Sequence, residues 1–267
     1  MNTPTTRNAT RLSPKRSLLA RKAGILLAVA AMLSTVVPSL TAYADSKGRG
    51  RDNPLVYNPA AKVHGKSLTD WLLTYWRWSF TGADLAESVV NGVQLMPIPA
   101  EEQISGAGTA EDPALLRGRI QFTLPEGTPF VLPASAWTQE RFNDGRPDEL
   151  PFAEDRYLEG ISPTLTIDGQ VVLSDANEAA FHIPPTPFDP VVLYDEPTSY
   201  GSIGVVAIQT VGVVVKPLKK GRHVVHLYEP YIIPGFSFGI IYDNTWEITV
   251  TEKHDEDEDH ADSHRRH

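Results

Sequence analysis

The chain has 267 residues, no cysteine, and 33 Asp and Glu against 24 Lys and Arg, which gives a formal net charge of −9. This acidic balance argues against a nucleic-acid partner, because such a surface repels phosphate groups. The lack of cysteine excludes disulfides, thiolate metal sites and a cysteine nucleophile.

Residues 1–44 have the layout of an export signal. Six basic side chains and no acidic one accompany the apolar stretch 23–37, and residues 42–44 offer small side chains for cleavage. The apolar stretch is shorter than the roughly 20 residues of a membrane-spanning helix, so we expect no membrane span after cleavage. The predicted protein is exported, periplasmic or extracellular. Removing six of the 24 basic residues leaves 18 against 33 acidic ones, a mature net charge of −15. A retained anchor and twin-arginine-like export through residues 13–19 are the alternatives.

Residues 45–62 mix charge, glycine and proline without periodicity, which is typical of a flexible lead-in. A helix is then expected to begin after Ser67, which can form an approximate capping box with Asp70. Apolar side chains cover more than half of its circumference, and the polar strip contains only Asp70, Thr74 and Arg77. The apolar positions are Leu68, Trp71, Leu72, Tyr75, Trp76, Trp78 and Phe80.

Strands are expected to dominate the rest of the chain. Apolar and polar residues alternate over 116–124. This alternation is typical of a strand in a sheet that has one face exposed to solvent. The Asp-Gly pair at 168–169 lies between apolar runs and predicts a two-residue hairpin. The stretch 203–215 is apolar and β-branched and is expected at the centre of the core, with a bend or bulge at Gly212. Further strands are expected at 222–228 and 245–251, and shorter ones at 89–96, 129–132 and 191–194.

These elements predict a mainly β fold with one helix. About eight strands, 22 prolines and no helix alternating with the strands disfavour a parallel α/β sheet. We expect a single domain over 63–251, an antiparallel β-sandwich or jelly-roll-like domain. The tryptophan-rich N-terminal helix would pack across one sheet or close one end.

Three segments carry a resemblance to a protein family. Residues 65–78 match the pattern G-x-[SY]-x-x-x-W-x(4)-W-x-W, which resembles the opening of an uncharacterised family of exported bacterial proteins. Segments 166–169 and 217–223 are similar to two later stretches of that family. The chain departs from the pattern in having Tyr75, where many relatives have a second adjacent Trp, and in lacking cysteine. The resemblance implies export and a shared fold, and it implies no activity.

Two features of the helix are candidate ligand contacts. Trp71, Tyr75 and Trp78 are spaced to line one side, and such a stripe forms either a platform for flat ligands such as sugars or, more often, part of a core. Arg77 in the polar strip can bind a carboxylate or sulfate group, or it is a solvated surface arginine.

The segment 133–163 is expected to be a functional loop. The 31 residues of this segment lack clear periodicity and exceed the usual length of a connection in a compact β domain. Trp137 and Arg141 are its candidate ligand contacts. Its carboxylates could supply a glycosidase-type pair, or they form an ordinary acidic surface. They are Asp144, Asp148, Glu149, Glu154 and Asp155.

Two groups of histidines are candidate metal ligands. On an extended strand, His223 and Glu229 share a face and His226 points away, so the three cannot hold one ion without a bulge. The segment 252–267 has seven carboxylates and four histidines and no apolar content, which predicts a disordered tail. This tail either solubilises the protein or binds divalent metal weakly through His254, His260, His264 and His267.

No nucleophile motif is found, because G-x-S-x-G and phosphate-binding glycine loops are absent from the sequence. We therefore expect an exported, non-catalytic β-sandwich that binds a ligand, such as a small molecule or glycan, or a protein partner outside the cytoplasm. One alternative is a secreted or periplasmic hydrolase acting on a carbohydrate-like substrate. Another is an envelope structural protein that docks through its aromatic helix. The sequence indicates neither a cofactor nor an oligomeric state.

Overall fold

The computed structural model describes residues 53–82, 85–151 and 153–252. The predicted export signal and the four tail histidines lie outside the described residues. Within this part of the chain, no helix has the length and hydropathy needed to cross a bilayer.

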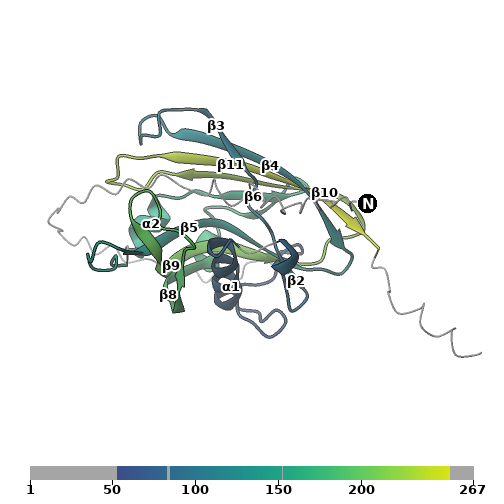
Figure 1. Ribbon diagram of the computed structural model, residues 1–267. Coiled ribbons are helices and arrows are strands. Elements are labelled where there is room, and N and C mark those ends of the chain that lie inside the picture. Colours follow the sequence, from purple (N-terminus) through teal and green to yellow (C-terminus); the bar gives the residue numbers. More distant parts are fainter. Residues whose placement is uncertain (1–52, 83–84, 152, 253–267) are drawn as a thin grey trace, which may run out of the picture.

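The fold consists of two facing β-sheets and a helix, α1 (Leu68–Phe80), that covers the outer face of the smaller sheet (Figure 1). The strands are β1 (Val89–Val90), β2 (Val93–Leu95), β3 (Glu101–Ser105), β4 (Ala114–Pro125), β5 (Phe130–Phe142), β6 (Thr164–Ile167), β7 (Gln170–Leu173), β8 (His182–Leu193), β9 (Ser202–Val215), β10 (Gly221–Tyr231) and β11 (Ile240–Thr251). The short helices are η2 (Leu85–Glu87), α2 (Glu154–Glu159) and α3 (Glu178–Phe181).

The predicted β-sandwich class is confirmed, but its sheets are mixed rather than purely antiparallel. The five-stranded sheet has the order β1-β2-β5-β9-β8, and the six-stranded sheet has the order β3-β4-β11-β10-β6-β7. Two of the pairs, β2 with β5 and β4 with β11, are parallel. The chain visits the opposite sheet between the two members of each parallel pair, so no hairpin turn forces them to run in opposite directions.

Helix α1 begins where its capping residues predict. The Ser67 hydroxyl accepts a hydrogen bond from the Asp70 backbone at 3.2 Å, and the Asp70 carboxylate accepts one from the Ser67 backbone at 3.0 Å. The helix lies close to the five-stranded sheet, because position 212 of β9 has no side chain. A Cβ atom at Gly212 would lie 2.7 Å from Cδ2 of Leu72.

The bulge that we expected at Gly212 lies on the neighbouring strand. In the register of β5 with β9, Pro133 faces Gly212 and Ser135 faces Val211, so the extra residue belongs to β5. Gly212 instead allows α1 to pack closely against β9.

The strand predictions for 116–124, 164–173 and 245–251 are confirmed. Asp168 and Gly169 have φ angles of 51° and 79° and join β6 to β7 as a hairpin. Trp246 and Ile248 of β11 are buried. In β4, Arg117 and Arg119 are exposed. Ile120, Phe122 and Leu124 lie on the other face and are half-buried or buried.

The prediction of a functional loop over 133–163 is wrong for its first ten residues. Residues 130–142 form β5, which lies between β2 and β9 in the five-stranded sheet. A strand buried on both faces shows no alternation of apolar and polar residues, which is why its periodicity was absent. The flexible lead-in predicted over 45–62 also needs correction in its described part. Val56 pairs with Val215 and is 2% exposed, because its side chain fills the core beside β9.

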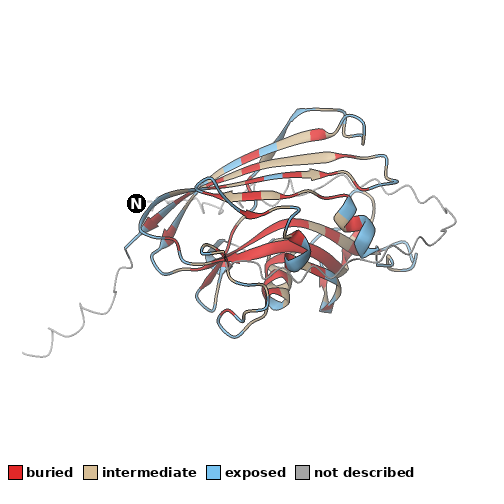
Figure 2. Ribbon diagram, turned by 180° about the vertical axis from the view of Figure 1, so that it is seen from behind, coloured by how far each residue is buried: buried red, intermediate tan, exposed pale blue. Residues whose placement is uncertain are grey.

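The two sheets differ in how fully they are covered. Figure 2 shows the five-stranded sheet as mostly buried, whereas the six-stranded sheet carries many residues of intermediate exposure. Helix α1 covers one face of the five-stranded sheet and the larger sheet covers the other, which explains the difference.

Candidate ligand-binding groove

A groove of about 440 Å³ lies on the surface between α1 and β8. Its apolar lining consists of Leu73, Pro187 and Phe188. Its polar lining consists of Lys66, Asp70, Thr74, Arg77 and Asp189. The volume falls within the range of small-molecule sites, which is about 300–1,000 Å³.

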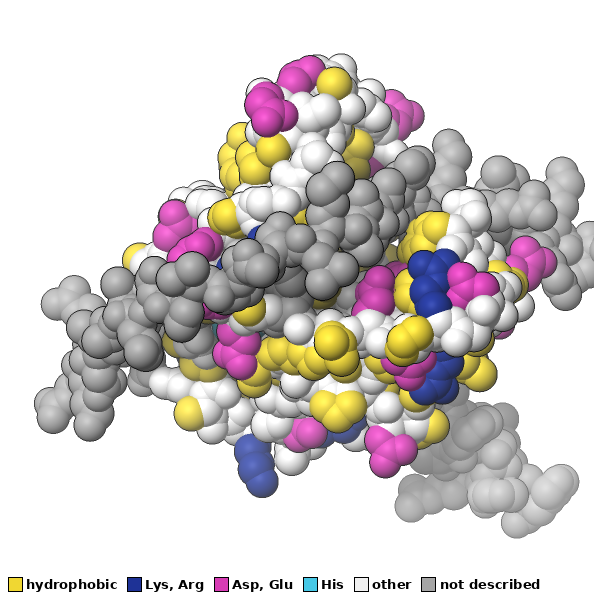
Figure 3. All heavy atoms as spheres, turned by 90° about the vertical axis from the view of Figure 1, so that its left-hand side faces the viewer, with side chains coloured by type: hydrophobic (Ala, Val, Ile, Leu, Met, Phe, Trp, Pro, Cys, Tyr) yellow, Lys and Arg dark blue, Asp and Glu magenta, His cyan; other side chains and the backbone are white. Residues whose placement is uncertain are grey.

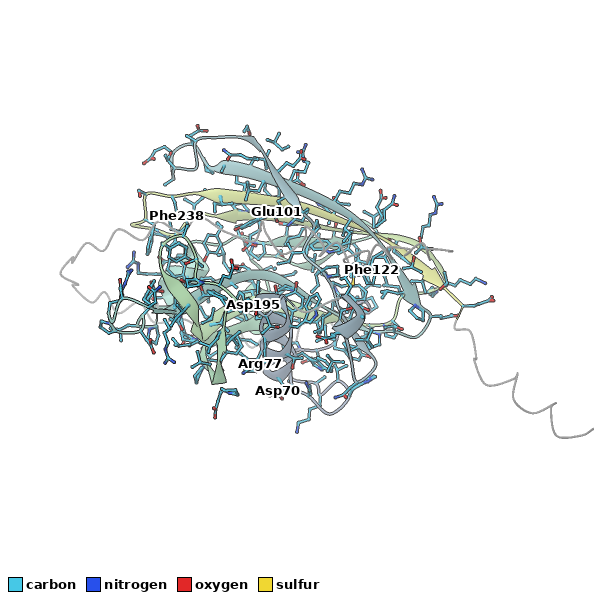
Figure 4. All side chains as sticks on the ribbon, in the orientation of Figure 1. Asp70, Arg77, Glu101, Phe122, Asp195 and Phe238 are labelled. Atoms are coloured by element: carbon cyan, nitrogen blue, oxygen red, sulfur yellow. The ribbon has the colours of Figure 1, made fainter. Side chains whose placement is uncertain are left out.

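The helical repeat brings three of the polar side chains together. Asp70, Thr74 and Arg77 follow one another at spacings of four and three residues, so they share one face of α1. Figure 4 labels Asp70 and Arg77 on the helix, beneath the five-stranded sheet. The polar strip predicted from the sequence is therefore one wall of the groove.

The end of the groove next to the N-terminus of α1 carries two opposite charges, those of Lys66 and Asp70. The Lys66 ammonium donates a hydrogen bond to the Thr74 hydroxyl at 2.9 Å. Hydrogen bonds from the side chain and backbone of Ser67 lower the pKa of Asp70, and the charge of Lys66 lowers this pKa further. Asp70 is therefore an anion at neutral pH.

The other end of the groove is formed around Arg77. Its Nη2 atom donates to the Pro190 carbonyl at 2.8 Å, and its guanidinium carbon lies 5.4 Å from the centre of the Phe188 ring. These two contacts hold the planar group in one orientation at the groove wall. An arginine has five N–H donors in a fixed fork, so an oriented guanidinium suits a carboxylate or sulfate.

The two tryptophans proposed as ligand contacts on α1 do not line the groove. Trp71 is 0% exposed, and its indole Nε1 donates to the Val63 carbonyl at 2.8 Å. Trp78 is half-buried and packs edge-on against Tyr75, with 5.7 Å between ring centres. Trp71 is thus a core residue, which was the more ordinary of its two interpretations.

The candidate contacts on β5 also lie elsewhere. Trp137 points between the two sheets and stacks on Tyr231, with ring centres 6.5 Å apart. Arg141 forms a bidentate ion pair with Asp148, at 2.7 Å for Nη2 and 3.0 Å for Nε. Neither residue lines the groove.

Two carboxylates of the acidic segment after β5, Asp144 and Asp148, form ion pairs with arginines. Besides the Arg141 pair, Asp144 binds Arg146 at 2.8 Å. Figure 3 shows basic and acidic side chains lying side by side at this end of the molecule. Asp144 and Asp148 are therefore neutralised by arginines and are poor candidates for acid–base chemistry.

Glu140 and Glu149 form a different kind of contact in this region. The Glu149 carboxylate accepts a hydrogen bond from the Glu140 backbone at 3.1 Å, and the Glu140 carboxylate accepts one from the Tyr200 hydroxyl at 3.0 Å. Burial raises the pKa of Glu149, the backbone hydrogen bond opposes this rise, and the charge of Glu140 adds to it.

The histidines of β10 are held apart, as their spacing predicts. His223 hydrogen-bonds the Asp168 carboxylate at 2.7 Å, and His226 hydrogen-bonds Asp243 at 2.8 Å. Within the described ranges, no group of three or more His, Asp or Glu side chains is arranged to hold a metal ion. The metal site proposed for the tail lies outside these ranges.

The sequence interpretation missed the β8 side of the groove. Pro187, Phe188 and Asp189 belong to a stretch with four prolines, at positions 184, 185, 187 and 190. Such a composition indicates a turn or an edge strand and gives no signal for a binding wall. Their proximity to α1 depends on the pairing of β8 with β9.

Comparison of the chain with the models of known protein families and with curated proteins finds no match. The interpretation of the groove therefore depends on its geometry and chemistry.

Proposed function

We propose that this protein is exported and binds, without chemical turnover, an acidic ligand in the groove between α1 and β8. The observation that carries this proposal is the oriented guanidinium of Arg77, held between the Pro190 carbonyl and the Phe188 ring at the wall of a groove of about 440 Å³. An arginine fixed in this way is ready to form paired hydrogen bonds with a carboxylate or sulfate.

The rest of the groove suits a ligand with both a polar and an apolar side. Leu73, Pro187 and Phe188 offer an apolar floor, and Asp70 and Lys66 offer an acceptor and a donor at the opposite end. Sugars with a carboxylate present these groups together, with hydroxyls at their edges and C–H groups on their faces. We therefore propose an acidic glycan or a small carboxylated molecule as the ligand.

Export is supported by the signal-like layout of residues 1–44. An acidic mature chain is compatible with a soluble extracellular or periplasmic binder, and its charge disfavours nucleic acid and anionic membranes as partners.

A glycan array tests the proposal directly. The mature chain, its Arg77→Gln variant and its Arg119→Gln variant would be applied to neutral and uronic-acid oligosaccharides. Arg119 is the matched control, because it lies on the exposed face of β4 and pairs with Glu247. We expect acidic glycans to bind the wild type and the Arg119 variant, with at least a tenfold loss in the Arg77 variant. Equal binding by all three proteins would contradict the assignment of the groove.

One observation favours a hydrolase as the second candidate. The Glu149 carboxylate accepts a hydrogen bond from the Glu140 backbone, and the Glu140 carboxylate accepts one from Tyr200. Burial raises the pKa of Glu149, as a general acid requires. A panel of glycoside substrates would show turnover that falls at least 100-fold in Glu149→Gln and is unchanged in Glu247→Gln. No turnover on any substrate of the panel by the folded wild type would count against this candidate.

The geometry gives little support to the third candidate, an envelope structural protein. That function requires the aromatic side of α1 to be available to a partner. Trp71, Tyr75 and Trp76 are instead buried against the five-stranded sheet.

A further inference from the structure

The groove between α1 and β8 is lined by charges of both signs. Lys66 and Arg77 are its cations, and Asp70 and Asp189 are its carboxylates. Their formal charges cancel, although the chain as a whole has 33 acidic residues against 24 Lys and Arg. The overall charge of the groove therefore gives no preference for an anion. Any preference must come from the positions of the individual charges.

These four side chains do not neutralise one another. Within the part of the chain that the structure describes, none of them belongs to an ion pair. The Lys66 ammonium instead binds the Thr74 hydroxyl and lies 4.8 Å from the centre of the Trp71 ring. Arg77 donates to a backbone carbonyl, which is a neutral acceptor.

Arginines elsewhere on the surface behave differently. Arg117, Arg119, Arg141 and Arg146 each pair with a carboxylate. Opposite charges that line one groove without pairing leave positions for a ligand that carries both signs itself.

One end of the groove brings a cation and a carboxylate close together. The Pro190 carbonyl accepts the hydrogen bond from Arg77 at 2.8 Å, and Asp189 is the residue directly before Pro190. Asp189 is exposed, so its carboxylate is open to a ligand. The guanidinium and this carboxylate are therefore neighbours at the same end.

This end matches the head group of an α-amino acid, which carries an ammonium and a carboxylate on one carbon. The guanidinium has five N–H donors, and the bond to Pro190 leaves others free for paired hydrogen bonds with a carboxylate. An ammonium group has three donors and no acceptor, so it suits the Asp189 carboxylate.

The neighbouring surface suits an apolar side chain. Leu73 precedes Arg77 by four residues and shares its face of α1, and Pro187 precedes Asp189 by two residues on β8. Asp70 lies seven residues before Arg77, which is about 10 Å along the helix axis. This span leaves room for a side chain of the size of leucine or phenylalanine between the two charged ends. Figure 4 labels Asp70 and Arg77 on the helix.

We propose that the groove binds a free α-amino acid with an apolar side chain. Its carboxylate binds Arg77, its ammonium binds Asp189, and its side chain lies against Leu73 and Pro187. This inference rests on the function proposed above, in which Arg77 binds a carboxylate, and it narrows the ligand from carboxylated molecules in general to a zwitterion.

Three probes of similar shape test the proposal by titration calorimetry on the purified protein. They are L-phenylalanine, 3-phenylpropanoate and 2-phenylethylamine, which carry both charged groups, only the carboxylate and only the ammonium. We expect phenylalanine to bind about tenfold more tightly than either of the others, because each of those lacks one hydrogen-bonded charge pair.

Two variants assign the two charges. Asp189→Asn keeps the shape of the side chain and should weaken phenylalanine binding about tenfold, without weakening 3-phenylpropanoate, which has no ammonium. Arg77→Gln should weaken both of these ligands. Glu102→Gln is the control, because it removes an exposed carboxylate from β3 of the other sheet, and it should bind every probe as the wild type does.

Circular dichroism would establish that the variants are folded. If Asp189→Asn does not fold, the comparison of the three probes on the wild type decides alone.

The outcomes separate this inference from the function on which it rests. Equal binding of phenylalanine and 3-phenylpropanoate, with both weakened in Arg77→Gln, would overturn the zwitterion and leave Arg77 as a carboxylate site. The same holds for a wild type that binds acidic glycans but no phenylalanine. Unchanged phenylalanine affinity in folded Asp189→Asn would also overturn the inference. Phenylalanine binding that is unchanged in Arg77→Gln would contradict both proposals.

Discussion

The indole of Trp76 on α1 donates a hydrogen bond to the hydroxyl of Thr210 on β9 at 3.0 Å. Thr210 in turn donates to the Ser135 carbonyl of β5 at 2.5 Å. One buried hydroxyl therefore links the helix to two adjacent strands of the five-stranded sheet. Thr210 is 0% exposed, so its partners are shielded from solvent.

Replacing this threonine tests the link. Thr210→Val keeps the volume but leaves the Trp76 N–H buried without an acceptor, so we expect a loss of about 1–3 kcal/mol in the free energy of unfolding. Urea denaturation would measure it. Thr249→Val, on the exposed face of β11, is the control and should change stability by less than about 0.5 kcal/mol. Equal effects of the two substitutions would contradict the role of Thr210.

The capping box of α1 predicts a stability change that depends on pH. The pKa of Asp70 is lowered by its hydrogen bonds with Ser67, so the folded protein binds this proton less tightly than the unfolded chain does. Its contribution to stability is therefore present above its ordinary pKa of 3.8 and is lost as the pH falls through the lowered folded value.

Asp70→Asn should cost about 0.5–1 kcal/mol at pH 7, and the cost should decrease steadily as the pH falls below the ordinary pKa of 3.8. Chemical denaturation of the wild type and the variant at several pH values would measure the difference. Asp195→Asn, at an exposed position after β8, serves as the control. A constant difference between wild type and Asp70→Asn at every pH would contradict the assignment.

Ionisation of Glu178 in α3 is expected to lower the stability of the protein, whereas ionisation of Asp70 raises it. Burial raises its pKa to about 7, and the charge of Asp175 adds to the rise. A raised carboxyl pKa means that the folded state retains the proton, so its ionisation destabilises the fold increasingly as the pH rises from about 4.5 to about 7.

Removing this carboxyl group should therefore stabilise the protein at alkaline pH. We expect Glu178→Gln to add about 1 kcal/mol at pH 8, a value that allows for solvent screening, and nothing at pH 4. Thermal unfolding at both values would measure the change. A lower midpoint for the variant at pH 8 would show that the carboxylate is stabilising in the fold.

Gly118 of β4 gives a prediction about packing. A Cβ atom there would lie 2.7 Å from Asn244 Oδ1 and 2.7 Å from the Pro99 side chain. Gly118→Ala should therefore displace the Glu101–Asn244 hydrogen bond and destabilise the protein by about 1–3 kcal/mol. Urea denaturation would measure the cost, and an unchanged unfolding midpoint would contradict the close packing.

The local features of this protein are determined by its sequence. The Ser67–Asp70 capping box, the Asp168-Gly169 hairpin and the alternation in β4 each depend on residues within a few positions of one another, so their chemistry is visible in the order of residues. The polar strip of α1 was predictable for the same reason, and it brought Asp70 and Arg77 to the groove. The export signal is also a local pattern, and it stays a prediction.

The pairing of distant segments was decided only by the tertiary structure. Strand β5 is buried on both faces and therefore lacks the periodicity that identifies a strand. The parallel pairings of β2 with β5 and of β4 with β11 arise because the chain crosses between the sheets. No local turn determines them. Phe188 completes the groove because β8 pairs with β9 beneath α1. Glu101 and Glu229 are 128 positions apart and meet on one face because sheet register, which long-range packing sets, brings their strands together.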